Sequence, residues 1–348
     1  MARKPLRRWI PGLILVLVIA SGIWWAQSRR TPTEYAVAYV AEPSAILWNA
    51  NAQVRQPVAT LHYGDRVAVL QRSGERAEVR SDAGTRGWID ALLLMDAELW
   101  RQSAELLDRV RKMPVQARGH TRTISNVRLA AGRDGPRIFQ FGRNEPVAVL
   151  ERNTSSAPRE GAAQTTVNLP KLEDWLLVLR TGPPGSGTGS AAGGAPSFSP
   201  GRSSAAPAVP IAGWVLARFI ELDPPPPIPD YFNAAGIRVV AWAVLNTVPD
   251  RGGPQPQYLV AGARGGEGQP CDFTLLRVYT WGASRQRYET AYVENNICGR
   301  MPIHVSATPA GADIRFADPA QGGAERAYRM RATTVRRVRE TATPQPPK

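Results

Sequence analysis

The sequence predicts a mostly β protein, with two small barrels joined by an amphipathic helix and a C-terminal β domain, all after one transmembrane helix. Three observations lead to this prediction. An uncharged apolar segment follows the N-terminus, short stretches of alternating polar and apolar residues fill most of the chain, and one Gly-Trp motif occurs twice. With 348 residues, 43% of them hydrophobic, the chain is long enough for two or three packed domains.

Residues 1–30 are predicted to form a cytoplasmic tip and a membrane anchor. Residues 9–27 are 19 residues without a charge, and as a helix they would span about 28 Å, close to the hydrocarbon thickness of a bilayer. Four basic residues precede this segment and two follow it. The positive-inside rule therefore predicts a single pass through the inner membrane, with the bulk of the chain in the periplasm. The alternative is a signal peptide cleaved before Ser21, which would leave a secreted protein.

Residues 36–95 and 114–222 are predicted to be the two barrels, because both consist of short alternating strands and end in similar sequences. The first ends in "RGWIDALLLM", with Gly87 and Trp88, and the second in "AGWVLARFIEL", with Gly213 and Trp214. Each glycine is expected to permit a close backbone approach, and each tryptophan to cover one end of a barrel core. The alternative is that each of these tryptophans faces a ligand instead of covering the core. The second copy also carries a Gly/Ser/Ala/Pro-rich insertion near 182–209, expected to be a disordered loop.

The rest of the chain divides into a helix, a linker and a third domain. Apolar residues at three-, four- and seven-residue spacings predict an amphipathic helix over 96–113 that links the barrels. The proline run at 223–231 predicts a stiff polyproline linker. Residues 232–340 show the strand pattern again and are predicted to be a C-terminal β domain.

The two repeats resemble bacterial SH3-like (SH3b) domains. The family pattern has Asn-Val-Arg near the start, a strand with a tryptophan, and a closing Gly-Trp-Val. The second repeat carries it in Asn126-Val127-Arg128, Trp175 and Gly213-Trp214-Val215, whereas the first lacks the Asn-Val-Arg and the strand tryptophan. The segment "DFTLLRVYTWGASRQRYETAYVE" resembles SH3 domain-containing proteins of acidobacterial type with an N-terminal membrane anchor, a likeness that names no activity.

The resemblance implies modules that bind peptidoglycan or its peptides, a role that SH3b domains often have beside cell-wall hydrolases. Four aromatic residues on or beside predicted loops are the candidates for the ligand groove: Trp48, Tyr63, Phe141 and Trp175. The expected function is therefore non-catalytic binding in the cell envelope. The alternative is a periplasmic scaffold or adaptor protein without a cell-wall ligand.

Neither a metal, a cofactor nor a catalytic centre is expected. The two cysteines, Cys271 and Cys298, are predicted to form a disulfide, because an exported chain folds in an oxidising compartment. Only three histidines occur, and none is spaced like a metal ligand of either cysteine. The chain has no Gly-x-Ser-x-Gly, no His-Glu-x-x-His and no phosphate-binding glycine loop. An enzyme with a site in the C-terminal β domain is a weaker alternative.

The net charge of +14 at pH 7 would suit an acidic partner. Six of the 43 basic residues flank the apolar N-terminal segment, where the membrane anchor explains them. The arginines and tyrosines near the C-terminus could bind nucleic acid, but export to the envelope argues against such a partner, so none is expected.

Overall fold

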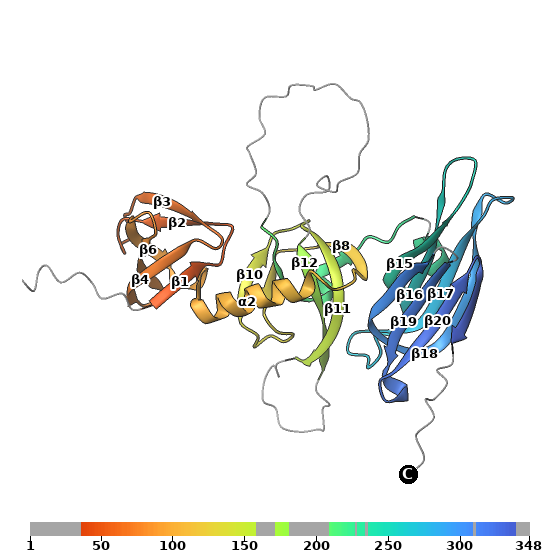
Figure 1. Ribbon diagram of the computed structural model, residues 1–348. Helices are drawn as coiled ribbons and strands as arrows, with labels where there is room; N and C mark the ends of the chain where they lie inside the picture. Colours follow the sequence, from red (N-terminus) through yellow and green to blue (C-terminus); the bar gives the residue numbers. More distant parts are fainter. Residues whose placement is uncertain are drawn as a thin grey trace, which may run out of the picture. The chain divides into compact units, whose positions relative to one another are not determined.

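The computed structural model describes residues 36–157, 171–180, 209–226, 228–233, 236–308 and 311–338 (Figure 1). They form three antiparallel sheets of seven strands each, which confirms the prediction of a mostly β fold. The strand orders leave each sheet open, so the described residues form no closed barrel. The predicted anchor in residues 1–30 and nearly all of the insertion near 182–209 lie outside the described residues. Within the described residues no helix has the length and apolar character needed to cross a membrane.

The chain divides into two compact units, one ending at Ala97 and the other starting at Glu98. The first unit contains a sheet of order β3-β2-β6-β5-β4-β1-β7. Its core consists of aliphatic residues that alternate with polar ones along the strands, as Ala77 and Val79 do in β5. The strands are β1 (Ala36–Val40), β2 (Ser44–Trp48), β3 (Pro57–His62), β4 (Arg66–Ser73), β5 (Arg76–Ser81), β6 (Arg86–Asp90) and β7 (Leu94–Asp96), with a 3-10 helix η2 (Ala91–Leu93) before β7.

The second unit contains α2 (Ala97–Val110) except for its first residue, and this helix forms within the predicted helical segment. Its first sheet, here called the second sheet, has the order β10-β9-β13-β12-β11-β8-β14, which repeats the order of the first sheet strand for strand. Leu106 and Val110 of α2 pack against this sheet, in one cluster with Trp175 and Trp214. The elements are β8 (Ala117–Thr121), β9 (Ser125–Arg128), β10 (Arg137–Phe141), β11 (Pro146–Ser156), β12 (Leu172–Arg180), β13 (Ala212–Leu216), the 3-10 helix η3 (Ala217–Phe219) and β14 (Ile220–Leu222).

The third sheet is a meander in which β15 to β21 follow one another in chain order. One face carries a large apolar cluster, and α3 (Ile228–Asn233) covers part of the other with Ile228 and Phe232. Residues 228–231 of the predicted polyproline linker are therefore helical, because these two apolar side chains bury themselves on the sheet. The elements are β15 (Arg238–Val248), β16 (Gln255–Ala263), β17 (Phe273–Gly282), β18 (Arg287–Thr308), β19 (Gly311–Asp318), the 3-10 helix η4 (Pro319–Gln321), β20 (Ala324–Arg331) and β21 (Thr334–Val338).

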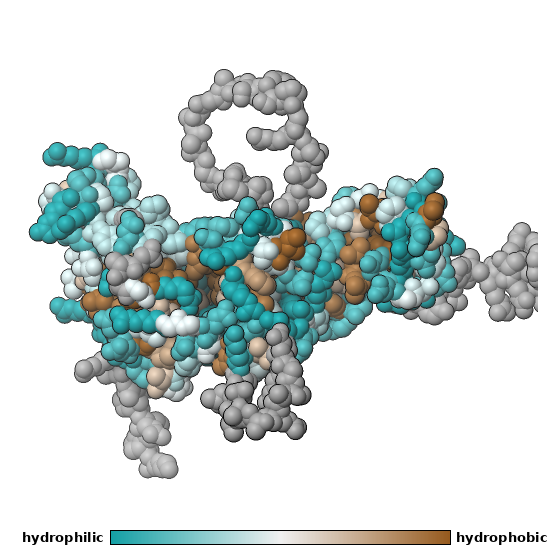
Figure 2. Space-filling model, turned by 180° about the vertical axis from the view of Figure 1, so that it is seen from behind, coloured by the Kyte–Doolittle hydropathy of each residue, from teal (hydrophilic) through white to brown (hydrophobic). Residues whose placement is uncertain are grey.

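The predicted disulfide between Cys271 and Cys298 is confirmed. It joins the chain just before β17 to the middle of β18. Polar residues cover most of the face shown in Figure 2, and hydrophobic residues appear there as small patches between them. The face seen in this view is thus mostly hydrophilic.

A buried arginine joins the second and third sheets. Arg152 in β11 is 8% exposed, and its Nη1 donates to Oδ1 of Asp272 at 2.7 Å. Its Nη2 donates to Oδ1 of Asp174 at 2.6 Å and to the carbonyl oxygen of Gln269 at 2.9 Å. Burial raises the pKa of Asp272, because desolvation outweighs the hydrogen bonds from Met301 and Arg152. Both carboxylates form an ion pair with this guanidinium, and Arg300 adds a further attraction on Asp272.

Gln116 joins the same two sheets at a second point. Its side-chain amide bonds to both backbone groups of Ile303, as a neighbouring strand would. Oε1 accepts from the Ile303 backbone nitrogen at 2.7 Å, and Nε2 donates to the Ile303 carbonyl oxygen at 3.2 Å. The backbone nitrogen of Trp242 donates to the Gln116 carbonyl oxygen at 2.8 Å. Buried backbone groups of the third sheet are thereby satisfied by the second.

Gly87 and Gly213 occupy equivalent places, as the second residues of β6 and β13. A Cβ atom on Gly87 would lie 2.6 Å from both Cγ of Leu47 and the carbonyl oxygen of Trp48. A Cβ atom on Gly213 would lie 2.5 Å from Cγ1 of Val127. The backbone of the neighbouring strand approaches too closely in both sheets for any side chain.

Replacing Gly213 by alanine is expected to reduce the free energy of unfolding by about 1–3 kcal/mol, because the added methyl group overpacks the core. Urea denaturation followed by far-UV circular dichroism measures the change. Gly266→Ala is the matched control, since no atom lies within 4 Å of the added methyl group there. Equal midpoints for the two variants would contradict the close approach.

Arg152→Met is expected to destabilise the second unit by about 3–5 kcal/mol, because it leaves two buried carboxylates without a cation. The triple variant Arg152→Met/Asp174→Asn/Asp272→Asn should regain at least half of that loss, since the amides keep accepting backbone hydrogen bonds without a charge. Urea denaturation of all three proteins tests this. An Arg152→Met protein as stable as the parent chain would contradict it.

Candidate ligand-binding cleft

The second sheet carries a cleft of about 240 Å³. A cleft of this size can take a small part of a larger ligand. Arginine, amide, aromatic and aliphatic side chains line it: Ile124, Asn126, Arg128, Arg133, Gln140, Trp175, Leu216, Arg218 and Phe219.

Strand β9 supplies two of these groups through the alternation of its side chains. Asn126 and Arg128 are two residues apart and share one face, whereas Val127 between them is fully buried in the core. Gln140 of β10 lies opposite Asn126, and its Nε2 donates to Oδ1 of Asn126 at 3.0 Å. The Asn-Val-Arg motif thus places its valine in the core and its two polar residues at the cleft.

Arg128 is held by the loop between β9 and β10. Its Nη1 donates to the carbonyl oxygen of Gly135 at 2.6 Å. Burial lowers the pKa of the guanidinium, but arginine stays protonated in proteins at physiological pH. The cleft therefore keeps this positive charge.

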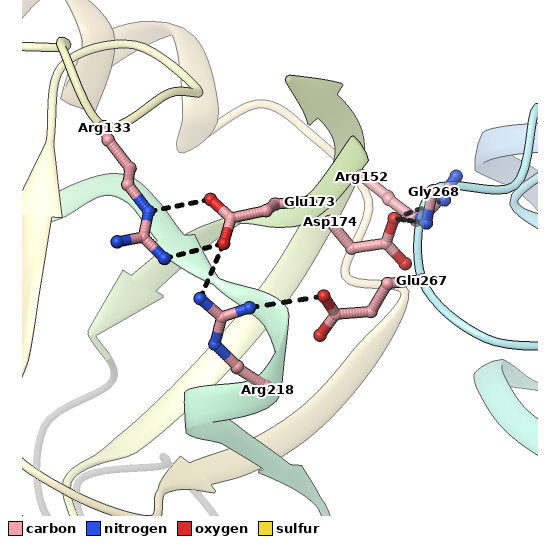
Figure 3. Close-up of polar contacts among 7 residues, drawn as sticks. All are labelled: Arg133, Arg152, Glu173, Asp174, Arg218, Glu267 and Gly268. Carbon is pink, nitrogen blue, oxygen red and sulfur yellow. Dashed lines mark hydrogen bonds and ion pairs between the residues drawn. The ribbon is translucent and has the colours of Figure 1, made fainter. Parts of the chain in front are cut away.

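Glu173 of β12 holds two further arginines at the cleft (Figure 3). Its side chain is only 3% exposed. Nε and Nη2 of Arg133 donate to its two oxygens at 2.9 and 2.7 Å, and Nη2 of Arg218 donates to Oε1 at 2.7 Å. The pKa of Glu173 is lowered to about 2, chiefly by the hydrogen bond from Arg133. The hydrogen bond from Arg218 lowers this pKa further. Glu173 is thus ionised throughout the physiological pH range and fixes both guanidinium groups.

Trp175 forms part of the cleft wall although it is only 1% exposed. Most of its ring packs in the cluster between α2 and the second sheet. Its Nε1 is buried and has no hydrogen-bond partner among the described residues. A buried donor without an acceptor costs about 1–3 kcal/mol, and a water or ligand oxygen that reached it would relieve this cost.

The four aromatic residues predicted for a groove do not come together. Trp175 lines the cleft, but Phe141 is fully buried beside Phe139, with ring centroids 5.7 Å apart. Trp48 and Tyr63 belong to the first unit and are half-buried there. Trp48 ends β2, with the guanidinium carbon of Arg55 4.4 Å from its ring centroid.

The two predicted tryptophan lids also differ. Trp214 is 7% exposed and belongs to the core cluster under α2, whereas Trp88 is half-buried in β6, opposite Trp48 in β2. Whether either contacts a ligand stays a prediction.

Several cleft residues went unrecognised in the sequence, namely Ile124, Arg133, Gln140, Leu216, Arg218 and Phe219. Arg218 and Phe219 lie three and four residues after the Gly-Trp-Val motif and could have been found by extending it. Arg133 gives no local signal, because its partner Glu173 is 40 residues away in the sequence.

No protein-family model and no curated protein matches this chain. Among solved structures, the comparison found NlpC2 from Trichomonas vaginalis, at 9% identity over 89% of this chain and 98% of that one, with a TM-score of 0.17. It also found NlpC1 from Trichomonas vaginalis, at 7% identity over 77% of this chain and 94% of that one, again with a TM-score of 0.17. At these TM-scores neither similarity bears on the function of this chain.

Lowering the pH is expected to weaken the cleft by protonating Glu173. Its folded pKa of about 2 lies below its ordinary value of 4.5, so the stabilisation is complete above pH 4.5 and is lost as the pH falls towards 2. The loss amounts to about 3 kcal/mol. Urea denaturation at pH 7, 5, 3.5 and 2.5 measures it. Glu173→Gln should be less stable at pH 7 and should lose less stability on acidification, whereas parallel curves for the two proteins would contradict the assignment.

Proposed function

We propose that this chain is a non-catalytic cell-envelope protein built on SH3b-like modules, and that its second module binds peptidoglycan or its peptides in the cleft. The observation that carries the proposal is the lining of the cleft, where three arginines, two amides and two aromatic rings gather. The identical strand order of the first two sheets supports the reading as a module and its repeat. The charges around residues 9–27 support an anchor in the inner membrane.

The cleft offers the groups that a cell-wall peptide needs. Guanidinium groups bind carboxylates through paired charge-assisted hydrogen bonds, and peptidoglycan stem peptides carry free carboxylates. The amides of Asn126 and Gln140 can both donate and accept, as peptide groups do. Trp175 and Phe219 supply apolar surface for the side chain or sugar beside them.

The same groups suit binding better than catalysis. Glu173, the carboxylate bonded to two of the cleft arginines, has a pKa of about 2 and cannot exchange protons efficiently near neutral pH. In the third sheet, burial raises the pKa of Tyr288 and Tyr328 to about 12 each. Both tyrosines lie within the apolar packing of that sheet.

Co-sedimentation with purified sacculi tests the proposal, with the full chain kept in detergent. The parent chain should pellet with sacculi at low and at moderate salt. Asn126→Ala/Gln140→Ala should bind about tenfold more weakly, because two hydrogen-bonding side chains are lost without a change of charge. Gln71→Ala/Gln102→Ala is the matched control, since it removes two amides outside the cleft.

Three outcomes would contradict the proposal. Pelleting that disappears at moderate salt would show only that a basic protein adheres to an acidic polymer. Equal binding by the two double variants would place the ligand elsewhere than in the cleft. Absence of pelleting at both salt concentrations would exclude cell-wall binding and favour the scaffold function, which crosslinking to an envelope protein would then test.

A further inference from the structure

A loop of the third sheet brings a carboxylate to the cleft. Glu267 lies between β16 and β17 in the glycine-rich segment "GARGGEGQP". Its Oε2 accepts from Nη1 of Arg218 at 3.3 Å (Figure 3). Arg218 thus lines the cleft while bonding to one carboxylate of its own sheet, Glu173, and to one of the neighbouring sheet.

These two partners of Arg218 are not equivalent. Glu173 bonds to it at 2.7 Å with a side chain 3% exposed, whereas Glu267 bonds at 3.3 Å with a side chain 33% exposed. Solvent-accessible ion pairs contribute little free energy because water and salt screen them. Glu267 is therefore the partner that another anion can replace, and Glu173 is the one that remains.

Replacing Glu267 would leave its loop in place. The backbone nitrogen of Gly268 donates to Oδ1 of Asp174 at 2.8 Å, and the carbonyl oxygen of Gln269 accepts from Nη2 of Arg152 at 2.9 Å. Both contacts are made by the backbone beside Glu267 and do not involve its side chain. Only the Glu267 side chain has to rotate, and it has room to do so because it is partly exposed.

The charges favour an anionic ligand group at this place. The cleft lining contains three arginines and no acidic residue. Glu173 pairs with Arg133 and Arg218, and Glu267 pairs with Arg218 alone, so displacement of Glu267 frees one side of the Arg218 guanidinium. A planar group with two acceptor oxygens matches the guanidinium best, and the group that Arg218 already binds from the neighbouring sheet is such a carboxylate.

We infer that the cleft takes a free carboxylate of a peptide ligand at Arg218, and that Glu267 occupies this guanidinium as an internal competitor while the cleft is empty. This inference rests on the proposed function, in which the cleft binds cell-wall peptides. It adds that the recognised group of the ligand is a carboxylate and that Glu267 weakens the binding of this group.

Isothermal titration calorimetry of the full chain in detergent tests the inference. The probes are a peptidoglycan stem tetrapeptide with free carboxyl groups and the same peptide with every carboxyl group amidated. The free acid should bind at least tenfold more tightly than the amide, since a charge-assisted pair is lost in the amide. Arg218→Gln should remove this preference.

Glu267→Gln is the decisive variant, because it removes the competitor and keeps Arg218. It should bind the free acid about two- to fivefold more tightly than the parent chain and the amide equally well. Glu325→Gln is the matched control. It removes an exposed carboxylate that pairs with Arg315, also at 3.3 Å, and should change neither affinity.

The possible failures are distinguishable. If Glu267→Gln binds the free acid no more tightly than the parent chain does, Glu267 is not a competitor for Arg218. If the parent chain binds the acid and the amide equally well, Arg218 does not recognise a carboxylate of the ligand. Both results leave the proposed function standing. Sacculi that pellet the protein while neither peptide binds would likewise overturn only this inference, whereas absence of both kinds of binding would remove the proposed function as well.

Discussion

The second unit depends on the buried guanidinium of Arg152. A buried charge is tolerated only when hydrogen bonds and opposite charges surround it, and Arg152 has Asp174, Asp272 and the carbonyl oxygen of Gln269. Two of these three partners, Asp272 and Gln269, come from the loop between β16 and β17 of the third sheet, and Asp174 comes from the second sheet. The two sheets therefore satisfy each other's charges, and neither can be built around a different partner without leaving a carboxylate buried alone. The position of the loop at Gly268 follows from this pairing.

Two consecutive residues of β12 connect this interface to the cleft. Side chains alternate along a strand, so Glu173 points to Arg133 and Arg218 while Asp174 points to Arg152 (Figure 3). Glu173 thus holds the charged groups of the cleft, and Asp174 helps to attach the third sheet. Any change that shifts β12 therefore acts on both at once.

Much of the framework could be predicted from the sequence, because it depends on local patterns. Alternation predicted the strands, spacing predicted α2, and the expectation that the chain is exported predicted the disulfide of Cys271 and Cys298. The cleft depends on contacts between distant residues, such as Arg133 with Glu173, 40 positions apart. Phe141 was expected beside a loop, but three of the five β10 residues are buried and its ring is among them. Trp175 lies within a run of six buried residues, and on its face of the sheet it packs in one cluster with Leu106 and Val110 of α2.

The shared arginine also limits how strongly the cleft and the interface can influence each other. Arg218 bonds to Glu173 within its own sheet and to Glu267 from the third sheet, so a ligand that engages Arg218 weakens one contact between the sheets, and by reciprocity that contact weakens the ligand. The pair concerned is partly exposed and contributes at most about 1 kcal/mol. Arg152 and Gln116 keep the sheets together without it. The linkage is therefore strong enough to adjust affinity by a few fold and too weak to separate the two sheets, so Glu267 would adjust the cleft without acting as a conformational switch.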